Sequence, residues 1–233
     1  MLAMKSRQVV KVMTLSMAPK GWTSIRDYLD YCRVKNGLIE GETSSMPPTP
    51  HEAAWLMTYL RQRHVNPKVV GGVAVVGHMA KLNRKDVRPT YDLDVWVDRV
   101  PSNPPEGWRR DPASVGVTSW ISPSGGTVDF LTPGHEYVHG KNPSKIDLDT
   151  SILSFPVATW QDLMRMKLMA MRSKDIPDLV ALYRVGVSRL GRNVTLTDIG
   201  LKVRGDEADN FDLIQRLYQA EPEANYRRWV APD

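Results

Sequence analysis

One stretch of the sequence decides the fold: RPTYDLDVWV, residues Arg88–Val97. Its side chains alternate with the period of two that is typical of a β-strand with one face buried. We expect this strand to span Tyr91–Val97. Its predicted inner face carries Tyr91, Leu93, Val95 and Val97, and its other face carries Asp92, Asp94 and Trp96. Two carboxylates therefore project from the same side of the strand.

A third carboxylate can join this pair from a neighbouring strand. Asp129 lies in the run TVDFL, Thr127–Leu131, and the turn SPSGG, Ser122–Gly126, separates that run from Val117–Ile121. The two runs predict a hairpin, and pairing within one sheet can bring Asp129 beside the other two acids. Three clustered carboxylates repel one another unless cations lie between them, and carboxylate oxygens are ligands that Mg²⁺ prefers. The pattern predicts a site for divalent cations.

A short strand and a glycine pair precede this region. The valine-rich segment Lys68–Val70 is stopped by Gly71 and Gly72, and Val73–Leu82 then has a helix-like composition. Backbone N–H groups at such a helix start, with no Cβ in the way, can receive a phosphate group. The segment therefore predicts a seat for a phosphorylated ligand.

Helical spacing dominates the two ends of the chain. We expect an α+β fold in which a small mixed sheet is flanked by helices and followed by a helical C-terminal region. The expected divisions are a helical segment at 1–64, a core at 65–157 and a helical region at 158–233. The expected helices are Thr23–Val34, Pro50–Arg63 (with Trp55, Leu56, Tyr59 and Leu60 facing the core), Trp160–Arg172, Ile176–Val187, Asp209–Ala220 and Pro222–Trp229, with one more strand at Phe155–Val157.

Composition narrows the class of protein. The 233 residues are 42% hydrophobic and 24% charged, which is ordinary for a folded domain. A formal charge of +5 and a pI near 9.3 favour polyanionic partners such as nucleoside triphosphates or RNA. The single cysteine, Cys32, excludes an internal disulfide and a cysteine-based zinc site, and a reducing cytoplasm is the expected location. Lys11 interrupts the apolar run Val9–Ala18, so we expect no export signal, and no apolar run predicts a membrane partner.

The short motifs together resemble a known family. Besides the glycine pair, the RPTYDLD stretch and Val128-Asp129-Phe130, the chain carries DLMRMKLMA at Asp162–Ala170 and RSKDIPDL at Arg172–Leu179. This set resembles the polymerase-beta-type nucleotidyltransferase superfamily, in particular its small bacterial branch with the AbiEii-type toxins. The resemblance covers about residues 65–185. One departure is the spacing of nineteen residues between Gly72 and Asp92, which is longer than usual for the superfamily motif.

The resemblance implies a nucleotidyltransferase fold and an activity. Such an enzyme transfers a nucleoside monophosphate from a nucleoside triphosphate, for example ATP, to a hydroxyl of tRNA or another RNA, a protein or a small molecule. Two Mg²⁺ ions, or Mn²⁺, serve the reaction. Asp92 and Asp94 would bind both ions, and Asp129 would bind the catalytic one and help to deprotonate the acceptor. The toxin-like branch also implies an antitoxin protein as a partner.

The same resemblance assigns the nucleotide contacts. Gly71 and Gly72 would contact the β- and γ-phosphates, and Thr90 would lie beside the metal-binding strand. Lys167 would neutralise triphosphate charge, with Asp178 or Lys174 orienting the lysine or the nucleotide. From its spacing alone, Lys167 could instead extend along the edge of the stripe formed by Met164, Leu168 and Met171.

Two other functions remain open at this point. A non-catalytic nucleotide-binding module or toxin–antitoxin partner of the same fold would share these motifs. The segment HEYVH, with His135, Glu136 and His139, matches the pattern of zinc hydrolases. Those enzymes present the two histidines from a helix, whereas Pro133-Gly134 and Gly140–Pro143 leave room for barely one turn.

Overall fold

The computed structural model describes residues 24–36, 45–82, 89–114, 116–134, 136–137, 140–141, 143, 145–149, 155–201 and 206–220. Within these ranges it has an α+β fold with a five-stranded mixed sheet, which confirms the expected class. The helices are α2 (Ile25–Asn36), α3 (Pro50–Gln62), α4 (Gly71–Ala80), α5 (Trp160–Ala170), α6 (Asp175–Leu190) and α7 (Asp206–Ala220), and the strands are β1 (Lys68–Val69), β2 (Asp92–Trp96), β3 (Arg109–Arg110), β4 (Thr118–Ile121), β5 (Thr127–Leu131), β6 (Glu136–Tyr137) and β7 (Gly140–Lys141).

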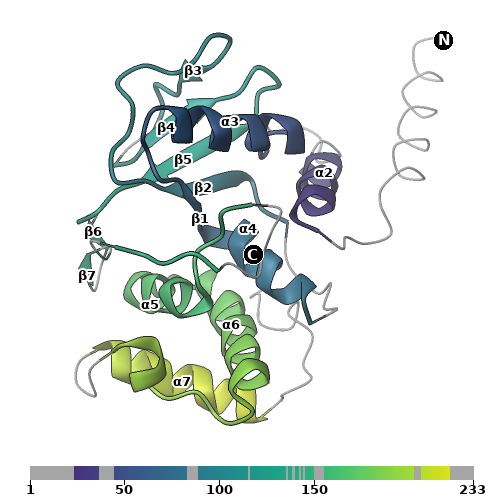
Figure 1. Cartoon of the computed structure of the whole chain (residues 1–233). Helices are drawn as coiled ribbons and strands as arrows, with labels where there is room; N and C mark the ends of the chain where they lie inside the picture. The colour runs from purple at the N-terminus through teal and green to yellow at the C-terminus, as the bar shows by residue number, and fades with distance from the viewer. Residues whose placement is uncertain are drawn as a thin grey trace, which may run out of the picture.

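The sheet and the C-terminal helices form two layers that meet at α4. The strand order is β1-β2-β5-β4-β3, with β2 and β5 parallel and the other neighbouring pairs antiparallel. Figure 1 shows α3 beside the sheet in the upper half, and α5, α6 and α7 gathered below it. Helix α6 packs against α4, α5 and α7. All seven residues from Val73 to Met79 of α4 are buried, as a helix between two layers requires.

Strand β2, which decides the fold, is present, but its predicted inner face is confirmed only in part. Leu93 and Val95 are fully buried, but Tyr91 precedes the strand and is 46% exposed, so its predicted place in the core is wrong. Trp96, predicted on the opposite face, is 3% exposed because the sheet is covered on both sides at that end. The hairpin of β4 and β5 is confirmed, with Ser119 opposite Asp129.

Helix α3 begins with a complete capping box, in which Thr49 and Glu52 satisfy each other's backbone N–H groups. Leu56 and Leu60 are buried as expected. Trp55 is not, since 42% of it is exposed. Its ring stacks on the buried rings of Tyr59, at 5.3 Å, and Trp108, at 6.3 Å between centroids, so Trp55 covers the edge of the core instead of lying within it.

Several boundaries differ from the expectation. Helix α4 starts at Gly71 itself rather than at Val73, and Phe155–Val157 contributes only an isolated bridge from Val157 to Val69. Glu136 lies in the two-residue strand β6, so this part of the HEYVH segment is extended rather than helical. The segments that lie outside the described residues include His135, His139 and the expected helix Pro222–Trp229.

His78 is a buried residue that joins three parts of the fold. Its Nε2 lies 2.9 Å from the carbonyl oxygen of Ala158, and its Nδ1 lies 3.2 Å from a guanidinium nitrogen of Arg189. Burial lowers the pKa of His78 to about 4. The neutral ring therefore ties α4 to α6 and to the segment before α5.

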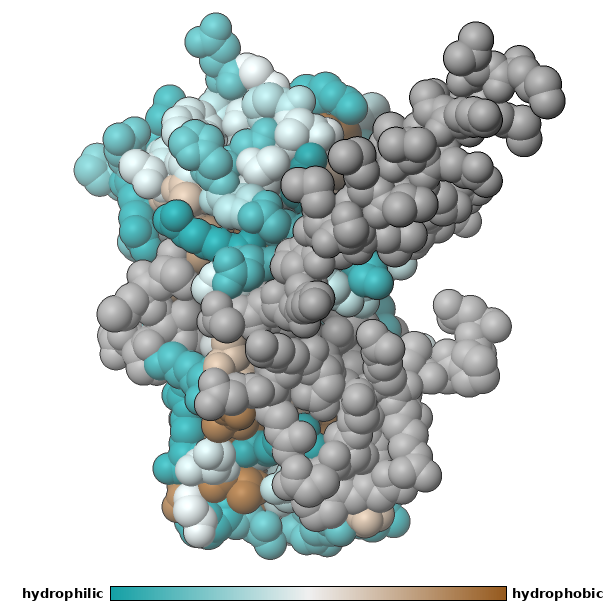
Figure 2. Space-filling view, turned by 90° about the vertical axis from the view of Figure 1, so that its right-hand side faces the viewer, coloured by the Kyte–Doolittle hydropathy of each residue, from teal (hydrophilic) through white to brown (hydrophobic). Residues whose placement is uncertain are grey.

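On the face seen in Figure 2 the coloured surface is mostly hydrophilic, with small hydrophobic areas mainly at the height of α5–α7. Within the described ranges, no helix has the length and apolar character needed to cross a membrane.

Candidate active site

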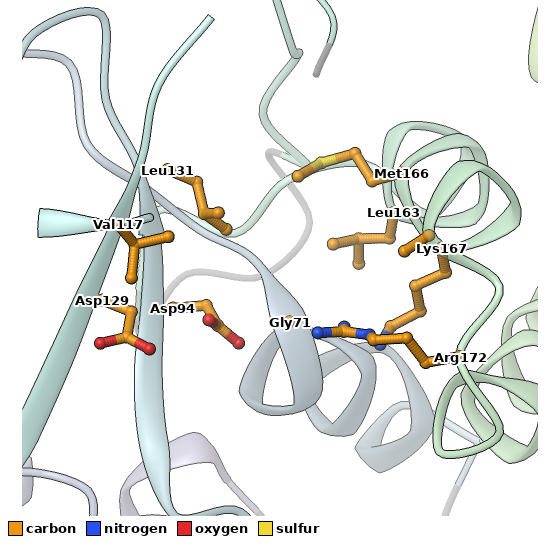
Figure 3. A pocket seen from close by; sticks show the side chains of 10 residues that line it. Gly71, Asp94, Val117, Asp129, Leu131, Leu163, Met166, Lys167 and Arg172 are labelled. Carbon is orange, nitrogen blue, oxygen red and sulfur yellow. The ribbon is translucent and has the colours of Figure 1, made fainter. Parts of the chain in front are cut away.

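Three carboxylates converge on the parallel strand pair. Asp94 on β2 lies in register with Asp129 on β5, and Asp92 lies two residues before Asp94 on the same face. One oxygen of each carboxylate lies within 4.8 Å of one from each of the others, and all three side chains are partly exposed. Figure 3 shows Asp94 and Asp129 next to each other on the adjacent strands. The structure thus brings together the three acids that the sequence singled out.

Neighbouring hydroxyl groups orient two of these carboxylates. Ser119 Oγ, on β4, donates a hydrogen bond to Asp129 Oδ1 at 2.6 Å. Thr90 Oγ1 donates to Asp92 Oδ1 at 3.0 Å. Each bond fixes one oxygen of its carboxylate, as second-layer donors do around metal-binding acids. Thr90 was predicted beside the metal strand, whereas Ser119 was not predicted.

Helix α2 supports the site through Thr90. The backbone N–H of Thr90 donates to Cys32 Sγ at 3.3 Å, and its carbonyl oxygen accepts from Asn36 Nδ2 at 2.9 Å. Cys32 and Asn36 are buried and lie one helical turn apart, so both reach the same point of the chain. The N-terminal part of the chain therefore holds the residue that orients Asp92.

The metal-free cluster carries an electrostatic cost. Burial, followed by the charges of Asp92 and Asp129, raises the pKa of Asp94 from 3.8 to about 8, although Lys167 and Arg172 act in the opposite direction. Burial likewise raises the pKa of Asp129, against the hydrogen bond from Ser119. Three carboxylates supply only hard oxygen donors, which suit Mg²⁺ and Mn²⁺. A divalent cation would remove the repulsion, and the residues present fit it.

Gly71 allows the approach of a helix start to these acids. The N–H of Val70 donates to the carbonyl oxygen of Asp94 at 3.0 Å, which places Gly71 directly beside the Asp94 side chain. The φ of Gly71 is +62°, and a Cβ there would overlap the Asp94 carboxylate, 2.6 Å from its Cγ. Only glycine satisfies both conditions. Despite the long spacing to Asp92, the glycine pair thus lies at the acids and opens α4.

Lys167 is held by two buried carboxylates. Its Nζ lies 2.6 Å from Asp178 Oδ2 and 3.0 Å from Asp175 Oδ1. It is only 5% exposed, so the alternative of a lysine extending into solvent from a methionine stripe is wrong. The expected contact between Asp178 and Lys167 is present. Lys174, the other residue proposed to orient the lysine, is exposed instead.

Arg172 and Asp175 were not singled out by the sequence reasoning. Arg172 Nε lies 2.7 Å from Asp175 Oδ2. Although burial alone would raise it, Lys167 and Arg172 lower the pKa of Asp175 to about 2. Met171 ends α5 in the left-handed conformation, with φ 40°, and this turn of the backbone positions Arg172 and Asp175. A non-glycine residue with positive φ has no clear signature in a single sequence, which explains the omission.

Two cavities adjoin the acids, and Gly71, Asp94, Asp129, Lys167 and Arg172 line both of them. The first, here called the polar compartment, has a volume of about 130 Å³. It is completed by Gly72, Thr90, Tyr91, Asp92 and Lys174. The second, the apolar compartment, has a volume of about 220 Å³ and lies between the sheet and α5 (Figure 3). It is completed by Val117, Leu131, Leu163, Met166 and Ala170.

Metal binding should release a proton and strengthen with pH. The pKa of Asp94 in the metal-free fold is about 8, above its ordinary value of 3.8. The contribution of protonated Asp94 to the free energy of unfolding is therefore fully present below about pH 4 and is lost as the pH rises through 8. A cation must displace the proton, so Mg²⁺ affinity should rise by about tenfold for each pH unit between 6 and 8. Calorimetry in buffers of different ionisation enthalpy measures the proton release. A pH-independent affinity over this range would contradict it.

The fold has similarities among solved structures. The fold is similar to the crystal structure of an antigenic nucleotidyltransferase-like protein from Paracoccidioides brasiliensis. The two chains share 14% identity over 75% of this chain and 88% of that one, with a TM-score of 0.40. No protein-family model and no curated protein matches the sequence. A structural similarity at this identity and TM-score shows no activity. The function is therefore inferred from the geometry of the site.

Proposed function

We propose that this protein is a metal-dependent nucleotidyltransferase that moves a nucleoside monophosphate from a nucleoside triphosphate to an acceptor hydroxyl. The observation that carries the proposal is the convergence of Asp92, Asp94 and Asp129 beside the glycine start of a helix. Acidic side chains alone would repel a triphosphate. Carboxylates that hold divalent cations beside backbone N–H groups able to bind phosphate would attract the triphosphate instead.

The residues divide the reaction between them. Asp92 and Asp94 would hold both cations, and Asp129 would hold the catalytic one. Bound Mg²⁺ ions supply alignment of the acceptor oxygen with the α-phosphorus and charge stabilisation of the leaving pyrophosphate. Asp129 would also accept the proton of the attacking hydroxyl. No covalent enzyme intermediate is needed.

The polar compartment provides the contacts for the triphosphate. The N–H groups of Gly71 and Gly72 lie at the positive end of the α4 dipole, which favours phosphate oxygens. The exposed Lys174 and the buried Lys167 both line this compartment and add positive charge. Asp175 and Asp178 would keep the Lys167 ammonium in place while the nucleotide binds.

The family resemblance supports finer proposals. The motifs support a proposed membership of the small bacterial branch of the polymerase-beta-type superfamily, with residues 65–157 as the proposed catalytic core and helical segments proposed at 1–64 and 158–233. An AbiEii-like toxin of this branch would act in the cytoplasm beside an antitoxin protein. The basic charge of +5 favours ATP or another triphosphate as a polyanionic partner.

A labelled-transfer experiment tests the proposal. Purified protein with Mg²⁺ and each α-labelled nucleoside triphosphate is incubated with RNA, protein or small hydroxyl compounds, and the labelled product is identified. We expect transfer that is lost, by about a thousandfold, on Asp92→Ala, since a metal site supplies several kcal/mol of transition-state stabilisation. Asp98→Ala is the matched control, because Asp98 is an exposed acid just beyond β2.

The outcomes separate the alternatives. Nucleotide binding that depends on Mg²⁺ but gives no transfer with any acceptor would make the chain a non-catalytic binding module. Stoichiometric zinc that is lost on replacing His135 or His139 would revive the hydrolase hypothesis. In cells, expression of the wild type but not of Asp92→Ala should arrest growth if the toxin proposal holds, and harmless expression of the wild type would count against it.

A further inference from the structure

The two compartments differ in what they can bind, although they share the carboxylates. The polar compartment holds the helix start and Lys174, which are contacts for phosphates. The apolar compartment adds only apolar side chains: Val117 and Leu131 from the sheet side, and Leu163, Met166 and Ala170 from α5. A triphosphate therefore belongs in the polar compartment, and the apolar one is left for another part of the reacting complex.

The geometry of in-line displacement determines which part of the reacting complex lies in the apolar compartment. The attacking oxygen has to reach the α-phosphorus from the side opposite the leaving pyrophosphate. Asp94 and Asp129 line both compartments, and Asp129 is the proposed proton acceptor. Figure 3 shows these two acids below Val117 and Leu131, which line the apolar compartment with them. With pyrophosphate held on the polar side, the acceptor comes from the apolar side.

The base of the donor nucleotide has another partner. Tyr91 lines the polar compartment, and its side chain is 46% exposed directly before Asp92. An exposed ring beside the phosphate seat offers a nucleobase a surface for stacking. The donor base therefore does not need the apolar compartment.

The end of an RNA chain fits the apolar compartment poorly. Phosphodiester recognition depends on cations, and the two that line this cavity, Lys167 and Arg172, also line the polar compartment, where the triphosphate is proposed to bind, so the apolar compartment adds no cation of its own for an RNA backbone. The volume of about 220 Å³ suits a compact body, because an apolar cavity of about 150 Å³ is enough to hold benzene.

We infer that the apolar compartment binds the body of the acceptor, and that the acceptor is a small molecule whose hydroxyl is carried by a compact, largely apolar frame of about one ring. This inference rests on the proposed nucleotidyl transfer. The acceptor oxygen forms a bond to the α-phosphorus, the bond from that phosphorus to the bridging oxygen breaks, and pyrophosphate leaves. The hydroxyl proton passes to the Asp129 carboxylate. The product is a nucleoside monophosphate ester of the ring compound.

Two space-filling variants test the inference. Met166→Trp fills the compartment from α5, and Val117→Phe fills it from the strand side at a partly exposed position that should tolerate the larger ring. The acceptor probes are p-cresol and cyclohexylmethanol, compared with kanamycin and an RNA oligonucleotide with a free 3′ hydroxyl. Leu190→Trp is the matched control, because it adds an indole at the exposed end of α6, about 20 Å along the helix from Asp175.

We expect the wild type to use the ring alcohols in preference to the RNA. Both filling variants should raise the KM for them by about ten- to a hundredfold while the Kd of a non-hydrolysable Mg²⁺–nucleotide analogue stays within about twofold. Leu190→Trp should change neither value. Nucleotide binding that weakens as much as acceptor use would place the donor base in the compartment and overturn the inference.

Transfer to RNA in preference to the ring alcohols, unchanged by either filling variant, would also overturn it. Failure of the proposed function itself looks different: the wild type would bind no nucleotide in a Mg²⁺-dependent manner, whatever residue occupied position 117 or 166.

Discussion

Replacing Asp94 by asparagine should abolish transfer and, in the same variant, stabilise the metal-free protein. The loss of activity should be about a thousandfold, since the amide cannot help to hold both cations. The metal-free fold should gain about 1–2 kcal/mol at pH 7, or about 2–8 °C in Tm, because folding at pH 7 has to protonate Asp94, whose pKa burial and the charges of Asp92 and Asp129 raise to about 8, whereas asparagine needs no proton. Opposite effects on activity and stability are typical of a functional site.

Thermal unfolding with and without Mg²⁺ measures this effect. The wild type should gain stability on adding Mg²⁺, whereas Asp94→Asn should start from a higher Tm and gain little. Asp98→Asn, at the exposed acid after β2, should behave like the wild type. A lower Tm for metal-free Asp94→Asn would show that Asp94 has a structural role instead of an electrostatic cost.

Gly71→Ala should damage both the fold and the metal site. A Cβ at this position overlaps the Asp94 carboxylate, and φ of +62° costs an alanine about 1–2 kcal/mol in addition. With overpacking included, we expect a loss of about 2–5 kcal/mol in the free energy of unfolding. Displacement of Asp94 should weaken Mg²⁺ binding by about ten- to a hundredfold. Denaturant unfolding and calorimetric titration measure the two effects.

Gly191→Ala separates backbone strain from the clash. Gly191 has a φ of +66°, close to that of Gly71, but a Cβ there meets no atom within 4 Å among the described residues. It should lose only about 1–2 kcal/mol of stability and keep its Mg²⁺ affinity. Equal losses in both variants would mean that the contact between Gly71 and Asp94 is unimportant.

The acids and their strands could be predicted because their signals are local. Period-two alternation identified β2, and the SPSGG turn identified the hairpin that carries Asp129. The parallel pairing of β2 with β5, which puts Asp94 opposite Asp129, joins strands thirty residues apart and has no local signal. The sequence could therefore predict that the acids can meet, but it could not give the register.

Other parts of the site depend on contacts between distant segments. The sequence identified Lys167 but not its pairing with Asp175, which needs the left-handed Met171 to turn the chain back. Tyr91 and Trp55 were assigned to the core because alternation and helical spacing mark a face without showing what covers it. Both are more than 40% exposed. Helix α2 was predicted, whereas its hold on Thr90 through Cys32 and Asn36 was not.

The central claim is that Asp92, Asp94 and Asp129 jointly hold divalent cations where a triphosphate binds. Diffraction at the manganese absorption edge, from crystals grown with Mn²⁺ and a non-hydrolysable triphosphate analogue, tests it most directly. We predict two anomalous peaks about 3.5–4 Å apart, both within coordination distance of these carboxylates and of phosphate oxygens. Anomalous peaks only at other residues, or an analogue bound away from Gly71 with the three acids bare, would contradict the claim.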